Sequence, residues 1–407
     1  MFQLSMRAFL DPQTIWTLSG VALRIAQRIG IHRDGSGYGL SVFETEIRRR
    51  IWFQLIIIDS TSAQFCGAAA SPMLKTADTQ PPMNANDSDL DPRMTDPACE
   101  KQGPTEMMFC LARCEFGKWL RRWNKDPGGS SSPWAFLTSS SLSLREKDNC
   151  IDELEKIMEQ KFLQYCDQSI PLHLATTMMV RSAIHYTRLM AHHPRQYRDP
   201  NVRISQEEKD LIFETCLKMA EYANHTQNSP DVWKFSWHTV NHMPWDAMIF
   251  MLTEIQYRTD PAEKSKVWQV IGSIYSRHVG QIRKKAKMPL HTAIQSLIVK
   301  AWKAYAEECN LHHRTPTSCP TIVAKLLQDS KGFTEPHPAQ EGSRVTENRD
   351  SFNEQPNHHG DTAPFDADID NFDFLSNAIP MDWNEWDNLL NQFQESLVDD
   401  MTLMPGC

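Results

Sequence analysis

The 407-residue sequence lacks the features that define several large classes of proteins. None of its ten cysteines forms a CxxC pair, the spacing typical of structural zinc sites. No apolar run approaches the ~18 residues of a membrane-spanning helix. The start of the chain has no signal-peptide pattern, because Arg7 interrupts its short apolar stretch. We therefore expect no membrane segment, and reduced thiols of the kind found in intracellular proteins.

Catalytic and nucleotide-binding motifs are also missing. The sequence contains no GxSxG, HExxH or P-loop motif, and its Gly-x-Gly-x-Gly run at 35–39 follows a predicted helix rather than a strand. Three aspartates at 87–91 resemble the start of a calcium loop, but Pro92 and Ala98 stand where that loop needs glycine and glutamate. The sequence therefore predicts no catalytic residue, no cofactor-binding residue and no metal ligand, and we expect that the protein is not an enzyme.

Two pairs of potential metal ligands have simpler interpretations. Cys110 and Cys114 are one helical turn apart, but no second pair follows at ligand spacing, so buried structural thiols are favoured over a metal site. His192 and His193 stand directly before Pro194. A weak metal site and solvated side chains are both compatible with this histidine pair, and the solvated state is favoured.

Helical periodicity is what the sequence does contain, and no stretch shows convincing β-alternation. Residues 13–30 predict a first amphipathic helix that ends at Gly30, because glycine adopts the left-handed conformation of a helix C-terminus without a Cβ penalty. Its predicted buried stripe is Ile15, Leu18, Ala22, Ile25 and Ile29. The same rhythm in later segments predicts an all-α fold.

A second predicted helix begins at Ser41, where Ser41 and Glu44 have the spacing of a capping box. Acidic residues stand four positions before Arg48 and Arg50, an arrangement that stabilises a helix by a few tenths of a kcal/mol per pair. The helix becomes apolar after Arg50. Asp59 is then a lone charge, and we weigh a buried acid with a perturbed pKa against an ion pair to Arg48–Arg50 that joins the two helices. The ion pair is favoured.

The remaining sequence divides into three regions. Residues 1–310 are predicted to form an irregular multi-helix bundle, with a proline-rich loop at 67–104. The later helices are predicted at about 105–123, from Ser143, at 170–191, from Ser205, at 261–284 and at 290–308. Residues 311–360 form a predicted polar linker that contains one short apolar segment at 321–327.

Residues 361–407 form an acidic tail with eleven Asp and Glu residues and no Lys or Arg, so the rest of the chain is nearly neutral. Bulky apolar residues are interspersed with these acids, a composition typical of disordered activation domains that fold on a coactivator. The alternatives are a last helix packed on the body and an inert solvated tail. The predicted coactivator-binding residues are Phe372, Phe374, Leu375, Trp383, Trp386, Leu389 and Phe393.

The stretch 16–67 carries a resemblance to a known family. It reads W-x-L-S-G-x-A-L-R-I-A-Q-R-I-G-I-H-R-D, then F-E-x-E-I-R-R-R-I-W-F and an aspartate. This pattern resembles the fungal-specific transcription factor domain, the helical middle homology region of binuclear zinc-cluster regulators. A looser resemblance extends over roughly 1–310, through P-x-N-x-N-D-x-D-L at 82–90 and T-E-M at 105–107. The signature residues are Trp16, Gly20, Arg24, Gly30, His32, Arg33, Asp34, Glu46, Arg48, Arg49, Arg50, Trp52, Asp59 and Gly67.

The resemblance implies a nuclear, all-α regulatory domain that tunes transcription by sensing ligands or partners beside a zinc-cluster DNA reader. Members of the family often control metabolic or specialised-metabolite genes. The acidic tail is then expected to bind coactivators or the transcription machinery. A homodimer or heterodimer is compatible with this role.

One element of the family pattern is not found in this sequence. The family's DNA reader has six closely spaced cysteines, whereas the first cysteine here is Cys66, inside the helical region. We therefore expect a chain without the zinc-cluster head, with zinc only in that head and DNA contact only through such a head or a partner. One interpretation is a truncated regulator. The alternative is a reader-less interaction or decoy subunit that pairs with full-length regulators or coactivators.

Overall fold

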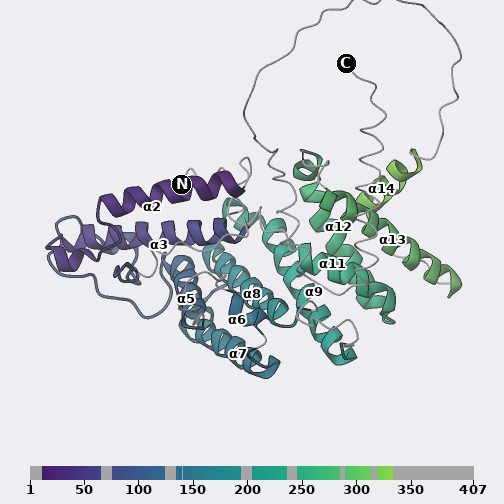
Figure 1. Cartoon of the computed structure of the whole chain (residues 1–407), viewed down its shortest axis with the longest axis horizontal. Coiled ribbons are helices and arrows are strands. Elements are labelled where there is room, and N and C mark those ends of the chain that lie inside the picture. Colours follow the sequence, from purple (N-terminus) through teal and green to yellow (C-terminus); the bar gives the residue numbers. More distant parts are fainter. Residues whose placement is uncertain are drawn as a thin grey trace, which may run out of the picture.

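The computed structural model describes residues 12–65, 76–123, 134–139, 141–193, 204–235, 245–284, 289–312 and 319–332. These ranges consist of α-helices, short 3-10 helices and connecting loops, without a strand, which confirms the all-α prediction. Figure 1 shows the helices following one another along the long axis, from α2 and α3 at one end to α13 and α14 at the other. None of the described helices has the length and apolar character required to span a membrane.

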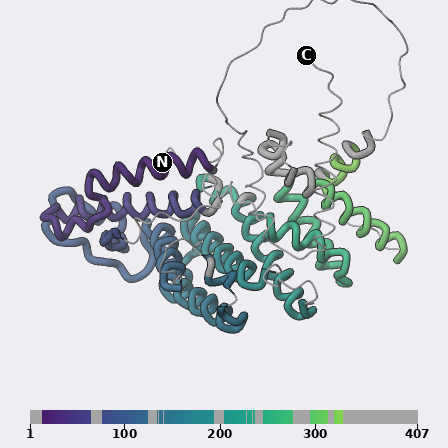
Figure 2. The backbone as a smooth tube through the Cα atoms, viewed as in Figure 1, coloured from purple at the N-terminus to yellow at the C-terminus, as the bar shows by residue number. Residues whose placement is uncertain are grey.

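The N-terminal half is built on a pair of long helices that continues into a group of four. Its elements are α2 (Pro12–Arg28), η1 (Gly35–Tyr38), α3 (Val42–Phe65), η2 (Asp87–Asp89), α5 (Met108–Trp123), α6 (Ala135–Thr138), α7 (Leu144–Lys161), η3 (Leu163–Tyr165) and α8 (Pro171–Ala191). The tube in Figure 2 shows α2 lying along α3 at the edge of the molecule. The loop between α3 and α5 returns along α3.

The C-terminal half surrounds the central helix α11. Its elements are α9 (Gln206–Asn228), η5 (Pro230–Phe235), α11 (Trp245–Glu254), η6 (Ile255–Tyr257), α12 (Pro261–Lys284), α13 (Pro289–Leu311) and α14 (Thr321–Gly332). Helix α11 packs against α9 and α13, and every residue from Ala247 to Leu252 is buried. This cluster is the largest apolar core among the described residues.

Several predicted helix ends are confirmed by hydrogen bonds. Ser143 and Glu146 form a reciprocal capping box at the start of α7. Ser205 accepts a hydrogen bond from the backbone N–H of Glu208 at the start of α9. Gly30 follows α2 with a φ of 77°, a conformation that favours glycine. Local sequence therefore determines where these helices begin and end.

The predicted buried stripe of α2 is wrong over its second half. Ile25 and Ile29 are 55% and 53% exposed. The helix has apolar residues on two faces, and α3 covers only one of them. The face that α3 covers consists of Ile15, Ser19, Leu23 and Ala26. Periodicity alone does not indicate which of two apolar faces receives the neighbouring helix.

The histidine pair after α8 is buried, so the prediction of solvated side chains is wrong. His192 is 5% exposed and His193 is 4% exposed. The imidazole of His192 lies between two carboxylates, with Nε2 2.7 Å from Asp148 Oδ1 and Nδ1 3.4 Å from Glu208 Oε1. Helices α7, α8 and α9 meet here, and the two carboxylates provide the polar partners that a buried histidine needs.

Helix α14 lies within the region predicted as a polar linker. Its Val323 side chain is fully buried in the C-terminal core, and α14 contacts both α12 and α13. Gly272 on α12 allows this close approach, because a Cβ there would lie 2.9 Å from Cβ of Pro320. The apolar segment at 321–327 is thus the first half of a packed helix. The boundaries at 310 and 360 remain predictions. The tail at 361–407, with all its predicted coactivator-binding residues, and Gly67 lie outside the described residues.

Candidate functional site

The bend after α2 brings the His-Arg-Asp segment against α3. Ile31 N–H donates to Ala26 O at 2.9 Å, a bond that ends α2 and is typical of glycine-terminated helices. Arg48 on α3 then binds the end of α2, since its Nη1 donates to Ile29 O at 3.2 Å. The same guanidinium binds Glu44 at 2.8 Å, as the i, i+4 spacing predicts. One arginine thereby joins both helices.

Asp34 and Arg49 form a two-pronged ion pair beside this bend. Arg49 Nε and Nη2 each donate to one Asp34 carboxylate oxygen at 2.8 Å. The carboxylate also accepts hydrogen bonds from the hydroxyl of Ser36 at 2.6 Å and from the backbone N–H of Gln80 at 2.9 Å. The Arg49 guanidinium holds the pKa of Asp34 well below its usual range, and Asp34 in turn raises the pKa of Arg49.

The loop after α3 is attached alongside the same segment. Asp78 accepts hydrogen bonds from the backbone N–H of Asp34 at 2.8 Å and from Arg33 Nη1 at 3.1 Å. The hydroxyl of Thr79 donates to Ile31 O at 2.9 Å. The Arg33-to-Asp34 segment therefore connects α2, α3 and the loop after α3.

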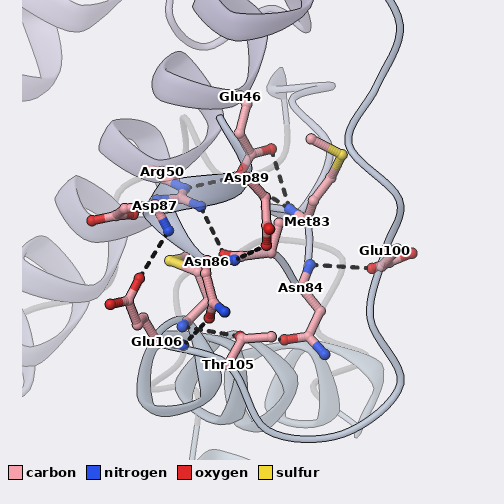
Figure 3. Close-up of polar contacts among 12 residues, drawn as sticks. Glu46, Arg50, Met83, Asn84, Asn86, Asp87, Asp89, Glu100, Thr105 and Glu106 are labelled. Atoms are coloured by element: carbon pink, nitrogen blue, oxygen red, sulfur yellow. Dashed lines mark hydrogen bonds and ion pairs between the residues drawn. The ribbon is translucent and has the colours of Figure 1, made fainter. Parts of the chain in front are cut away.

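A second ion pair, between Glu46 and Arg50, holds the loop further along α3 (Figure 3). The side chain of Glu46 is fully buried and accepts hydrogen bonds from Arg50 Nε at 2.9 Å and from the backbone N–H of Met83 at 3.2 Å. Arg50 also binds Asp87 at 2.5 Å and Ala85 O at 3.2 Å. Burial of Glu46 is tolerated because the carboxylate is ion-paired and hydrogen-bonded. We call Asp34–Arg49, Glu46–Arg50 and the bound loop 76–107 the α3 clamp.

Two asparagines connect the α3 clamp to the start of α5 (Figure 3). The hydroxyl of Thr105 donates to Asn84 Oδ1 at 2.6 Å, and the backbone N–H of Glu106 donates to Asn86 Oδ1 at 2.9 Å. Glu106 Oε2 accepts from the backbone N–H of Asp87 at 2.8 Å. These four polar side chains, which belong to Asn84, Asn86, Thr105 and Glu106, were not among the predicted site residues. The P-x-N-x-N-D and T-E-M patterns are the sequence signal for them.

Asp59 is buried, but the predicted ion pair with Arg48–Arg50 is wrong. Ser19 Oγ of α2 donates to Asp59 Oδ1 of α3 at 2.7 Å. Asp59 therefore does join the two helices, through a serine hydroxyl. The arginines lie two or more turns away along α3 and bind other carboxylates. Ser19 lies at the centre of the buried face of α2. The sequence analysis missed it because buried positions were predicted from apolar residues only, and serine is polar.

The other signature residues divide into buried and exposed sets. Trp52 is 1% exposed, and the ring of His32 lies 6.3 Å from it between ring centroids. Trp16 is 39% exposed and Arg24 is exposed. A Cβ at Gly20 would meet no atom within 4 Å. Packing in this structure therefore explains the tryptophan at 52, and nothing in it explains the residue types at 16, 20 and 24.

The chemistry of the α3 clamp is that of a structural connection. Asp34 and Glu46 are bound by guanidinium and N–H groups, so they are charge partners rather than proton-transfer groups. Burial raises the pKa of the nearby Cys114 thiol to about 12, which makes it a poor nucleophile. Within the described ranges, no group of three or more His, Cys, Asp or Glu side chains could hold a metal ion, and the free cysteines there do not form a six-cysteine cluster.

Comparison with known proteins identifies the family. The family model described as the fungal specific transcription factor domain matches residues 1–219, more than half of the chain. The chain belongs to this family. The matched part of the fungal specific transcription factor domain contains the whole α3 clamp, and helices α11 to α14 lie beyond the matched residues.

Relatives of this domain are fungal regulators. The aurofusarin cluster transcription factor aurR2 of Gibberella zeae is 32% identical over 300 residues, covering 74% of this chain and 44% of that protein. Transcriptional regulator AacuB of Aspergillus aculeatus is 27% identical, covering 75% and 41%. Pyriculol/pyriculariol biosynthesis cluster transcription factor 1 of Pyricularia oryzae is 26% identical, covering 80% and 44%. The chain thus spans less than half the length of these relatives. No solved structure matches it.

Proposed function

We propose that the protein is a fungal regulator of zinc-cluster type that controls transcription of a specialised-metabolite gene set. Family membership over residues 1–219 is the observation that carries this proposal. It is supported by relatives whose names refer to the aurofusarin and pyriculol/pyriculariol clusters. Because the chain spans less than half of those relatives, the activity belongs to the whole protein and this chain supplies its regulatory part.

The proposed division of labour follows the sequence regions. Residues 1–310 form the regulatory body, on which α14 packs. The rest of residues 311–360 connects this body to the tail, and residues 361–407 activate transcription. DNA contact is assigned to a zinc-cluster head or to a partner that has one, because the described cysteines are dispersed free thiols. The protein acts in the nucleus, as this role requires.

The activation role of the tail has a direct test. Residues 361–407 are fused to a heterologous DNA-binding domain and reporter transcription is measured. We expect activation that is lost when Trp383, Trp386 and Phe393 are replaced by Ala, because these side chains supply the apolar face that a coactivator groove would bury. A reporter that stays silent, or that is unchanged by the triple substitution, removes the tail from the proposal.

The regulatory role is tested in the fungus that carries the gene. Deletion of the gene is followed by transcript measurement across the genome. We expect a contiguous group of biosynthetic genes to fall together and to recover when the gene is restored. Unchanged transcripts, under growth conditions in which the gene itself is transcribed, would contradict the proposed function.

A further inference from the structure

An open hollow lies where the loop of the α3 clamp meets α5 and the end of α7. Its volume is about 390 Å³, within the usual range of small-molecule sites. Four large apolar side chains line it, with Phe53 on α3, Leu111 on α5, Phe162 between α7 and η3, and Tyr165 in η3. The hollow therefore lies at the junction between the N-terminal helix pair and the following four helices.

Most charges around the hollow are already paired. Lys161 lies 3.1 Å from Glu115, and Lys101 lies 2.5 Å from Asp89 outside the lining. Glu100 accepts a hydrogen bond from the backbone N–H of Asn84 at 3.4 Å. The paired groups contribute little net charge, whereas Glu100 keeps its negative charge at the edge formed by the loop.

The two other charged side chains that line the hollow are cations on α5. Lys118 and Arg121 line the hollow one turn apart, and neither forms a hydrogen bond or an ion pair with any residue in the described part of the chain. Both side chains are exposed at the edge of the hollow. They can therefore bind the charged group of a ligand whose apolar body enters the hollow.

We propose that this hollow binds a small amphipathic organic acid. The apolar body of the ligand packs on Phe53 and Leu111, and its anionic group binds Lys118 and Arg121. An apolar floor with two cations at one side fits a monoanion on an aromatic or aliphatic body better than it fits a polyphosphate, which needs a denser set of donors.

Asn84 connects the hollow to the α3 clamp. It lines the hollow, and its side chain accepts the hydrogen bond from Thr105 at the start of α5. A bound ligand would thus hold the loop, α5 and η3 together. Any effect on transcription rests on the proposed function. Binding itself does not, so a silent tail fusion would leave the binding result unaffected.

The test uses two fluorescent probes that share an anilinonaphthalene ring system. One is 1-anilinonaphthalene-8-sulfonate, which is anionic, and the other is N-phenyl-1-naphthylamine, which is uncharged. The purified full chain is titrated with each. We expect the double variant K118Q/R121Q to bind the sulfonate about tenfold more weakly, as loss of two partly exposed charge contacts predicts. Affinity for the uncharged probe should stay within about twofold.

Two further variants locate the site. The matched control R145Q/K303Q removes two exposed cations elsewhere and should leave both affinities unchanged. Tyr165→Ala removes a ring that is 41% exposed, so the fold is retained, and it should weaken both probes. The proposal is overturned if the wild-type chain binds no sulfonate at up to about 1 mM. It is equally overturned if K118Q/R121Q matches the control, or if Tyr165→Ala changes neither affinity.

Discussion

Asp34 connects the segment after α2 with α3 and with the loop after α3, through its carboxylate and its backbone N–H. Its carboxylate binds Arg49 of α3 and the N–H of Gln80 in the loop, while its own N–H donates to Asp78. Charge-assisted pairs of this geometry are about twice as strong as neutral hydrogen bonds. Removal of one partner also leaves the other with an unpaired charge at a partly buried position.

Asp34→Asn should therefore lower the free energy of unfolding by about 2–3 kcal/mol, because the amide cannot accept both Arg49 donors as an ion pair. The pKa of Asp34 is lowered in the folded state, so its stabilisation is present above the unfolded pKa of ~4 and is lost as pH falls further. Urea denaturation followed by circular dichroism measures both effects. Asp91→Asn, at an exposed position, is the control and should change little. An equal loss in both variants would contradict the role of Asp34.

We predict that His185 also makes the free energy of unfolding depend on pH. Burial, with smaller contributions from Lys218, Arg188 and Arg181, lowers its folded-state pKa to about 4, against 6.5 for a free histidine. Its neutral form is therefore favoured in the fold, and stability present above pH 6.5 is lost as pH falls toward 4. His185→Phe keeps a ring against Tyr222 and should flatten this part of the pH profile.

The control for that measurement is His225→Gln, at an exposed position of the neighbouring helix. It should leave the pH dependence of unfolding as in the wild type. If His185→Phe shows the same decline between pH 6.5 and 4 as the wild type, another group is responsible and the assignment to His185 is wrong.

Single helices show where sequence reasoning succeeded and where it could not. Caps such as Ser143–Glu146 and the stop at Gly30 depend on neighbours within four residues, and they were predictable. The partner of Asp59 lies 40 positions away at Ser19, and Thr105, which binds the Asn84 side chain, follows it by 21 positions in the same loop. Those contacts depend on how helices are placed in space, which no local pattern specifies.

Helix α2 offers a direct comparison of its two apolar faces. Leu23 is 3% exposed against α3, whereas Ile25 is 55% exposed. Leu23→Ala should cost about 2–5 kcal/mol because it leaves a cavity in a packed interface. Ile25→Ala should change the free energy of unfolding by no more than about 0.5 kcal/mol. Thermal or urea unfolding compares them, and similar losses for both would mean that α2 packs by a different face.

At the scale of the whole molecule, α14 packs against α12 and α13. Val323 of α14 is fully buried in the C-terminal core. Val323→Ala should therefore lower the free energy of unfolding by about 1–3 kcal/mol. Lys325→Ala, at an exposed position of the same helix, is the matched control. If both variants unfold like the wild type, α14 is not part of the cooperative core.

The family is also a property of the whole chain. It could be predicted from the sequence more reliably than any single side-chain contact. The signature at 16–67 was sufficient to name the family, and the match over 1–219 confirmed it. The geometry then explained part of that signature. Glu46 and Arg50 attach the loop to α3, Arg49 binds Asp34 after α2, and Trp52 is buried in the adjacent core.

The α3 clamp connects α2, α3 and the loop before α5 in the body that we propose regulates transcription. The most direct test restores a deletion strain with the Arg49→Ala gene and measures transcripts of the genes that depend on the regulator. Arg93→Ala, which removes an exposed arginine from the same loop, is the control. We predict that Arg93→Ala restores these transcripts and that Arg49→Ala fails to restore wild-type levels. Equal restoration by both genes would show that the regulator does not depend on the Asp34–Arg49 pair of the α3 clamp.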